Sequence, residues 1–365
     1  GAPYFDAAPG PDLDDDATPD DAVDLVRLSA LLDPDLPETI DLSPGVYGNN
    51  SLGTDDGSGH GDNPITGEAY APNVVSLADF GRVIAEIWAD GPRSETPPGH
   101  WNAIANEVAD HPLFEARLFG EGEVIDRAAW DVHVYLALNG ALHDAAIAAW
   151  EAKRQYESAR PITLIRYMGE RGQRSDPDLP SYDPAGLPLV PGLIELINEA
   201  STAPGERHAH LAPYRGQIAL RSWRGEPGDR DNEVSGVGWI RAVEWLPYQR
   251  RTFVSPAFPG YVSGHSTFSR AAAEVLTAMT GSAFYPGGLG ELVIEPDYLV
   301  FEGGPAEGFT LTFATYYDAA DQAGQSRLWG GIHIVPDDYV GRRIGSEVGL
   351  TAVAHARRFF DGSAR

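Results

Sequence analysis

The amino-acid sequence predicts a mainly α-helical protein with long loops and one small β-hairpin. Between Asp126 and Ser158, apolar residues recur at i, i+3, i+4 and i+7, which is the spacing of one helix face. A second run, Tyr339–Phe360, repeats apolar residues one helical turn apart. Only Glu291–Glu295 and Phe309–Phe313 read as short strands, and we expect them to pair as a hairpin.

The alanine-rich run between Asp126 and Ser158 permits close helix contact. We therefore predict that it forms the central helix of a four-helix bundle, which is the catalytic core of the protein.

Residues 1–75 are rich in Asp, Pro and Gly, which favour turns. We predict an irregular N-terminal segment that packs on a helical catalytic domain of residues 76–365, with one short amphipathic piece at Ala22–Leu32. The chain starts at Gly1 without a basic and apolar leader. This start is expected for a processed chain or for the C-terminal part of a longer one.

The run from Asn49 to Pro64 is rich in carboxylate and carbonyl oxygens, the ligands that calcium prefers. Its spacing matches no known calcium loop, so a solvated surface loop is the favoured interpretation. A structural calcium ion remains the alternative.

The helical pattern begins at Ser76, stops at Pro97-Pro98 and restarts over Trp101–Val108. His100 is therefore predicted in a loop or cap, with a pocket-lining position as the alternative. His143 and Asp144 fall inside the central helix, where satisfied core or interface groups are commoner than catalysts.

Residues 170–232 contain many Gly, Pro and Asp residues and predict a long surface excursion. His208 and His210 alternate within it, but no third metal ligand is evident. Val234–Tyr248 is predicted to form a further helix, and Tyr317–Gly324 another.

The chain carries 54 acidic and 26 basic residues, a net charge of -28. Such a field repels nucleic acid and anionic membrane surfaces, so we exclude both as partners. No apolar run approaches the ~18 to 20 residues of a membrane span. The absence of cysteine excludes disulfides and thiolate metal sites. The acidic composition leads us to expect a secreted or periplasmic protein.

One stretch, Phe258–Thr267, combines two close-approach glycines, a serine and a histidine. Ser263 is a natural N-cap for the apolar run that follows it. The first amides of a helix have no internal acceptor and together carry about half a positive charge. A tetrahedral oxyanion is therefore expected to bind at Ser263 and the Gly264 amide, with His265 beside it.

Two other stretches carry cations. Lys153 and Arg160 are seven residues apart, and both face one side if the helix persists to Ser158; a basic helix end that complements the dipole is the alternative. Arg327 and His333 follow near the C-terminus. Together the three stretches specify a site for a multiply charged oxyanion, since buried cations are costly without one.

The motifs Lys-x6-Arg-Pro at 153–161, Ser-Gly-His at 263–265 and Ser-Arg-x5-His at 326–333 resemble those of one superfamily. It joins type-2 phosphatidic acid phosphatases, bacterial acid phosphatases and vanadium-dependent haloperoxidases. Val262 stands where the phosphatases usually have proline, and the run 138–150 resembles the helix that precedes the lysine in haloperoxidases. The whole pattern is most similar to the vanadium-dependent haloperoxidase family, whose helical-bundle fold we expect here.

The resemblance implies a vanadate (vanadium(V)) cofactor and the oxidation of bromide or chloride by hydrogen peroxide to hypohalous acid. A small organic halogen acceptor would be the further partner. Trp150 and Phe258 match the positions of active-site aromatics in fungal chloroperoxidases and would line the halide and substrate pocket.

The resemblance also implies the roles of the motif residues. His333 would bind vanadium, and Asp337 would either fix its tautomer or cap a helix. Lys153 would polarise bound peroxide, and His265 would move protons. The remaining residues would hold cofactor oxygens together with Lys153: Arg160, Ser263, Gly264 and Arg327.

Two alternatives stay open. An acid phosphatase would use His333 as the nucleophile, forming a phosphohistidine, and His265 to protonate the leaving alcohol. A non-catalytic oxyanion-binding protein would leave His265 without a role.

In the resembling haloperoxidases two bundles are common, whereas this chain has helices for one bundle and part of another. We therefore expect a homo-oligomer or association with an N-terminal portion outside this sequence.

Overall fold

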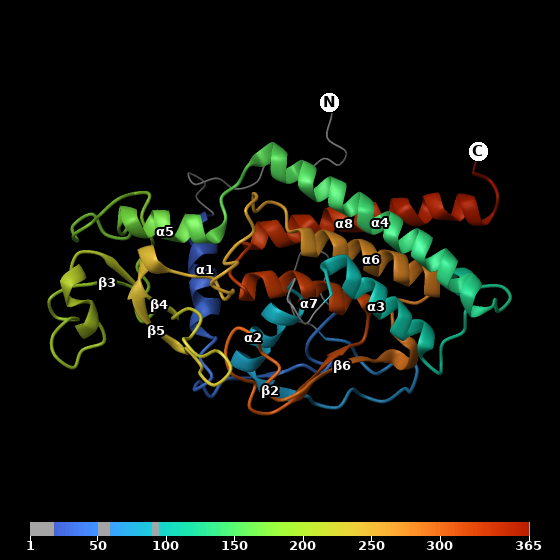
Figure 1. Cartoon of the computed structure of the whole chain (residues 1–365), viewed down its shortest axis with the longest axis horizontal. Helices are drawn as coiled ribbons and strands as arrows, with labels where there is room; N and C mark the ends of the chain where they lie inside the picture. Colours follow the sequence, from blue (N-terminus) through green and yellow to red (C-terminus); the bar gives the residue numbers. More distant parts are fainter. Residues whose placement is uncertain (1–17, 50–58, 90–94, 365) are drawn as a thin grey trace.

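The computed structural model describes residues 18–49, 59–89 and 95–364. Its long axis is formed by a helical bundle, with a small sheet at one end (Figure 1). The helices are α1 (Thr18–Ala30), α2 (Leu77–Ile87), α3 (Pro97–Asp110), α4 (Arg127–Tyr156), α5 (Pro161–Arg171), α6 (Gly264–Thr280), α7 (Tyr316–Trp329) and α8 (Val335–Phe360). The strands are β1 (Thr39–Asp41), β2 (Val74–Ser76), β3 (Ile194–Leu196), β4 (Ile218–Trp223), β5 (Val237–Arg241), β6 (Gly290–Ile294) and β7 (Phe309–Phe313).

The bundle is built around α6, which packs against α4, α7 and α8. In Figure 1, α4 runs along the outer edge of the molecule and α6 lies between α4 and α7. The predicted helical-bundle fold is confirmed, but α6, and not α4, is its central helix. Alanines at 271, 272 and 273 are fully buried on α6, so neighbouring helices approach it closely.

A row of glycines brings α8 against α6. Gly341, Gly345 and Gly349 lie one turn apart on α8, and a Cβ atom at Gly345 would lie 2.4 Å from the carbonyl oxygen of Thr267. At Gly349 it would lie 2.6 Å from the carbonyl oxygen of Ala271. The two backbones are therefore too close for any side chain at these positions, and the starts of α6 and α8 are fixed side by side.

This close approach makes a testable prediction. Gly345→Ala should lower the free energy of unfolding by about 1–3 kcal/mol, because the added methyl group overpacks the α6–α8 contact. Gly140→Ala is the matched control, since nothing lies within 4 Å of a Cβ atom there, and it should stabilise by about 0.5–1 kcal/mol. Urea unfolding of both variants measures the difference. Equal effects at the two sites would contradict the proposed helix contact.

The region predicted as a surface excursion contains a sheet with its own core. Strands β3, β4 and β5 form an antiparallel sheet in that order, with Leu220 opposite Ile240. Side chains of the sheet, α1 and α5 form a second buried cluster that includes Val26, Leu164 and Ile194. Figure 1 shows this sheet beside α5, away from the bundle.

The predicted helix over Val234–Tyr248 was wrong. Val237–Arg241 forms β5 and pairs with β4, and Ala242–Glu244 follows as a single 3-10 turn. A strand followed by a turn places Trp239, Ile240 and Trp245 at spacings that imitate a helix face. Pairing with β4 decided the outcome, because strand formation depends on its neighbours more than on local preference.

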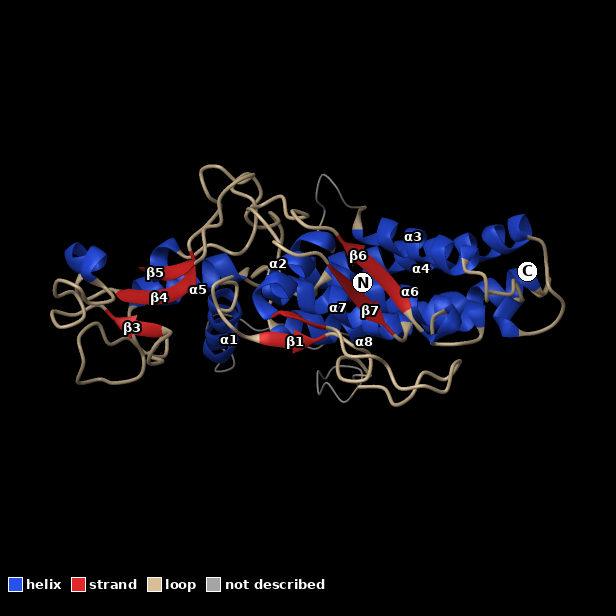
Figure 2. Ribbon diagram, turned by 90° about the horizontal axis from the view of Figure 1, so that it is seen from below, coloured by secondary structure: helices blue, strands red, loops and turns tan. Residues whose placement is uncertain are grey.

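The predicted hairpin is confirmed as β6 and β7, which pair with Leu292 opposite Leu311. Figure 2 shows the hairpin lying along the bundle, with the β3–β5 sheet at the far end of the molecule.

Two helices are longer than predicted. α7 continues through Arg327, and α8 begins at Val335 with Pro336 in its first turn, where proline is tolerated.

Within the described ranges no helix is both long and apolar enough to cross a bilayer. Residues 50–58 of the oxygen-rich run fall outside the described part of the chain. The calcium alternative for that run therefore stays a prediction.

Candidate active site

A cavity of about 780 Å³ opens where α4 ends and α6 begins. Eight of the ten predicted site residues line it, from all three motif stretches: Trp150, Lys153, Arg160, Phe258, Gly264, His265, Arg327 and His333. Ser263 is the N-cap of α6 directly beneath it, and Asp337 lies behind His333.

Backbone hydrogen bonds hold the three stretches together. The amide of Ser263 donates to the carbonyl of Asp337 at 2.9 Å, which joins the start of α6 to the start of α8. The amide of Tyr261 donates to the hydroxyl of Ser158 at 2.8 Å, just beyond α4. These backbone hydrogen bonds fix the walls of the cavity relative to one another.

His333 is held in one tautomer. Its Nδ1 lies 2.7 Å from Asp337 Oδ2, so Nδ1 carries the hydrogen and Nε2 keeps its lone pair. Arg160 Nη1 donates to that lone pair at 3.0 Å. Burial, followed by the charge of Arg160, lowers the pKa of His333 well below its ordinary value. The imidazole is therefore neutral, and its Nε2 lone pair lies at the cavity wall, where it accepts from Arg160.

Asp337 serves both of the purposes that the sequence left open. It is the third residue of α8, and its Oδ2 also accepts from the Ile334 amide at 3.4 Å, as well as from His333. Burial raises the pKa of Asp337 to about 7, and the charges of Lys153 and Arg160 oppose that rise. One carboxylate thus caps the helix and orients the imidazole.

The cations are held mainly by carbonyl dipoles. Lys153 Nζ donates to the carbonyls of Pro259 and Gly260, at 2.9 and 2.8 Å. Arg160 donates to the carbonyls of Phe258 and Ile332, both at 2.8 Å. No carboxylate in the described part of the chain lies within 4.0 Å of either cation. Their charge is therefore available to a ligand.

Arg327 projects into the cavity from α7 and is 1% exposed. Its Nη2 donates to the carbonyl of Ala85 at 2.9 Å, and its Nε donates to the Ser326 hydroxyl at 2.9 Å. Both bonds fix the direction of the guanidinium group.

Several observations fit a tetrahedral, multiply charged oxyanion. Arg160 Nη2 is buried and has no acceptor among the described residues. The Ser263 hydroxyl oxygen accepts from the Ser266 amide at 3.3 Å, which leaves its hydrogen for a ligand. The Gly264 amide is the first of α6 and has no acceptor within its own helix. These donors and cations match vanadate or phosphate.

His265 is also held in one tautomer. Its Nε2 lies 2.8 Å from the carbonyl oxygen of Trp88, so Nε2 donates and Nδ1 keeps a lone pair. Burial, followed by the charge of Arg327, lowers the pKa of His265 well below its ordinary value. The ring is therefore neutral, and the lone pair of Nδ1 is the one that could accept a proton.

The predicted aromatics lie at the mouth of the cavity. Trp150 and Phe258 are 44% and 38% exposed, and their ring centroids are 5.2 Å apart. Lys153 Nζ lies 5.8 Å from the Trp150 ring and 5.3 Å from the Phe258 ring. The two rings therefore contact the cation from the entrance side.

Sequence reasoning missed the contribution of α2. The carbonyls of Ala85 and Trp88 fix Arg327 and His265, and no side-chain motif marks a carbonyl. The apolar wall formed by Pro97, Phe268 and Phe301 was also missed, because apolar residues of this kind read as core.

His100 and His143 differ from their predicted places. His100 lies in the first turn of α3, is 9% exposed and lines a second cavity, so the loop assignment was wrong. The side chains of His143 and Asp144 are 73% and 40% exposed and contribute to no core. His210 Nε2 lies 2.8 Å from the carbonyl oxygen of Trp239, and no metal-binding cluster of acidic and histidine side chains occurs over the described ranges.

The charges that line the cavity predict how oxyanion affinity depends on pH. Burial and the nearby Arg160 charge lower the pKa of Lys153 to about 7. A bound dianion favours the protonated amine and raises this pKa, so binding above about pH 7 takes up a proton. Affinity should therefore be highest below pH 7 and fall by up to about tenfold per pH unit above it. Ionisation of Asp337 over the same range acts in the same direction.

Isothermal titration calorimetry with tungstate, whose charge is constant near neutrality, measures this dependence. Lys153→Met should bind more weakly and lose most of the slope. An unchanged slope in that variant would assign the proton uptake to another group.

Comparison with known proteins gives a family match. The family model described as "VCPO second helical-bundle domain" matches residues 133–362, which contain all three motifs. No curated protein matches the chain.

Two solved structures have the same fold. An apo-type bacterial vanadium-dependent chloroperoxidase superposes with a TM-score of 0.59 at 17% identity, covering 98% of this chain and 53% of the other. A holo-type bacterial vanadium-dependent chloroperoxidase gives a TM-score of 0.54 at 17% identity, covering 94% and 48%. This chain spans about half the length of the solved chloroperoxidases that it matches.

Proposed function

This chain belongs to the vanadium haloperoxidase family, and from that premise we propose that it oxidises bromide or chloride with hydrogen peroxide, using bound vanadate, to give hypohalous acid. One observation carries the proposal. A neutral His333 keeps its Nε2 lone pair at the wall of a cavity that is also lined by buried cations, and a metal bound at Nε2 would take the place of the hydrogen bond from Arg160. Neutral imidazole nitrogen is the form that binds a metal.

The residues that would hold vanadate follow from the geometry. His333 Nε2 would bind the metal, while Arg160, Arg327 and Lys153 would neutralise the oxygens. The Ser263 hydroxyl and the Gly264 amide would add neutral hydrogen bonds. When bound, vanadate would supply Lewis-acid activation of hydrogen peroxide without a change in its own oxidation state.

The protein would contribute positioning and proton transfer. Asp337 would keep His333 in its metal-binding tautomer. His265 would accept a proton at Nδ1 and return it, while the Trp88 carbonyl holds the ring in place. Lys153 would place its positive charge beside the oxygens, between Trp150 and Phe258, where halide would enter. A small organic molecule would accept the halogen.

The test is an assay of metal-free protein with and without orthovanadate. Bromide or chloride oxidation that needs both hydrogen peroxide and vanadate supports the proposal. Hydrolysis of p-nitrophenyl phosphate that vanadate inhibits, without halide oxidation, would assign the cavity to phosphate ester chemistry instead. Tight phosphate binding with neither activity would indicate an oxyanion-binding protein.

A further inference from the structure

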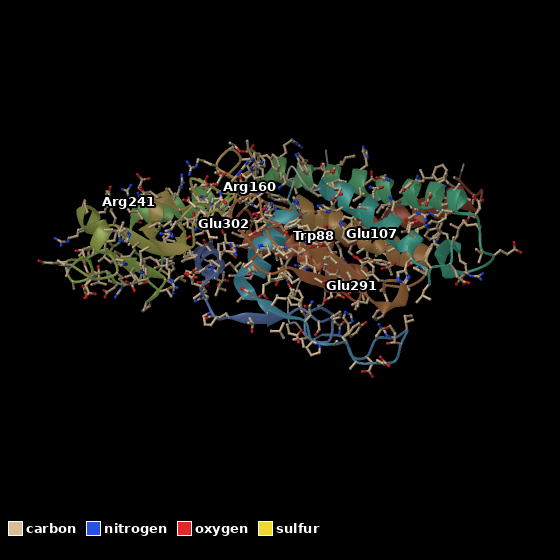
Figure 3. The ribbon with its side chains drawn as sticks, turned by 60° about the horizontal axis from the view of Figure 1, so that its bottom comes forward. Trp88, Glu107, Arg160, Arg241, Glu291 and Glu302 are labelled. Carbon is tan, nitrogen blue, oxygen red and sulfur yellow. The ribbon has the colours of Figure 1, made fainter. Side chains whose placement is uncertain are left out.

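A second cavity, of about 560 Å³, lies between α2, α3 and the β6–β7 hairpin. Trp88 separates it from the candidate active site, because its ring lines the second cavity while its carbonyl accepts from His265. In Figure 3, Glu107 and Glu291 lie on the side of Trp88 away from Arg160. The two cavities are therefore neighbours with different linings.

The inner wall of the second cavity is aromatic. Trp88 and Tyr285 are 4% and 8% exposed. Phe313 also lines the cavity, and its ring is stacked on that of Tyr285 with the centroids 6.5 Å apart. The Tyr285 hydroxyl forms no hydrogen bond with any described residue, and its oxygen keeps some contact with solvent. A polar group of a ligand in the cavity can therefore hydrogen-bond to it.

The rim of the cavity is acidic. Glu95, Glu107 and Glu291 line it, and no lysine or arginine does. Neither Glu107 nor Glu291 has a basic partner within the described ranges. Two histidines, His100 and His111, also line the cavity, and His100 Nδ1 lies 3.5 Å from Glu95 Oε2. Burial and the charge of Glu95 raise the pKa of Glu107, as expected for carboxylates that share a site. The cavity therefore favours positive charge.

We propose that this cavity binds a small organic cation with a flat apolar body, such as an arylalkylamine. The ring of the ligand would pack on Trp88 and Tyr285, and its ammonium group would face Glu107 and Glu291. Aromatic faces and carboxylates both attract cations, and the volume is that of a site for a small molecule. This inference does not depend on halide chemistry.

A bound metal ion is a poorer explanation of the acidic rim. No three acidic or histidine side chains in the described part of the chain lie close enough together to hold one. Carboxylates spread around an aromatic wall match an extended cation better than a point charge.

Calorimetric titration of vanadate-free protein with tryptamine tests the proposal. Indole-3-propionate carries the same ring with a negative charge and should not bind. Binding of tryptamine should be saturable with one site, and it should weaken as salt is added.

The double variant Glu107→Gln/Glu291→Gln should weaken tryptamine binding by about tenfold, since each partly exposed charge pair contributes modestly. Glu170→Gln/Glu347→Gln makes the same charge change at exposed helix positions and should leave the affinity unchanged. Circular dichroism and the thermal midpoint check that all variants fold. No saturable binding to the parent protein would overturn the proposal, as would equal affinity in the two double variants or equal binding of indole-3-propionate.

Discussion

His333→Ala is expected to abolish retention of vanadate, with a loss of affinity greater than about hundredfold. Removing a group that only orients a metal ligand typically costs about 10–100-fold, and here the ligand itself is removed. Binding of tungstate, which the cations attract without a metal–nitrogen bond, should fall much less. Vanadate and tungstate titrations of the same variant separate coordination from electrostatic attraction.

Asp337→Asn provides the graded comparison. An asparagine can still contact His333 Nδ1, but it removes the negative charge that favours the Nδ1–H tautomer. Vanadate affinity should fall by about 10–100-fold, between the parent and His333→Ala. Full vanadate affinity in His333→Ala would rule out this histidine as the metal ligand and remove the basis of the proposed function.

The groups of the candidate site were predictable because each belongs to a short motif. The Ser263 cap, the first amide of the helix and His265 are adjacent in sequence, so local helix chemistry joins them whatever the rest of the fold. Asp337 was also predictable, since four residues separate it from His333 at the start of a helix. The relative placement of the three motifs followed from the family resemblance and not from the spacing within each motif.

What the sequence did not predict depends on backbone contacts between distant segments. The carbonyls of Ala85 and Trp88 orient Arg327 and His265, yet alanine and tryptophan at these positions read as ordinary core residues. β5 was mistaken for a helix because its pairing partner, β4, is too distant in the sequence to appear in a local hydrophobic pattern. The Gly341, Gly345 and Gly349 repeat was visible in the sequence, but its meaning depends on α6 lying opposite.

The net charge of -28 and the cationic cavity have a common consequence. At Arg160 and Lys153, burial excludes water and the hydrogen-bond partners are mainly carbonyls, so the local positive charge persists in an acidic molecule. Surface acids are screened within about 8–10 Å at ordinary salt, whereas buried cations are screened much less. Selection of an oxyanion is therefore set by the cavity and not by the overall charge.

The second large effect is expected for His265→Gln. Glutamine can donate to the Trp88 carbonyl as the imidazole does, but it has no basic ring nitrogen that could accept a proton during turnover. Vanadate affinity should therefore change by less than about threefold, because this side chain supplies none of the cofactor's main ligands. Turnover of halide should fall by about 10²–10⁴-fold, the usual contribution of a general acid–base group.

Paired measurements of vanadate affinity and of bromide oxidation at several pH values distinguish proton transfer from positioning. If His265 moves protons, the variant loses activity at every pH while it still binds vanadate. If the ring only supports the Trp88 segment, His265→Gln restores activity that His265→Ala loses. Activity within about fivefold of the parent would assign proton transfer to another group, with Lys153 as the nearest alternative because its pKa of about 7 suits a general acid–base role at neutral pH.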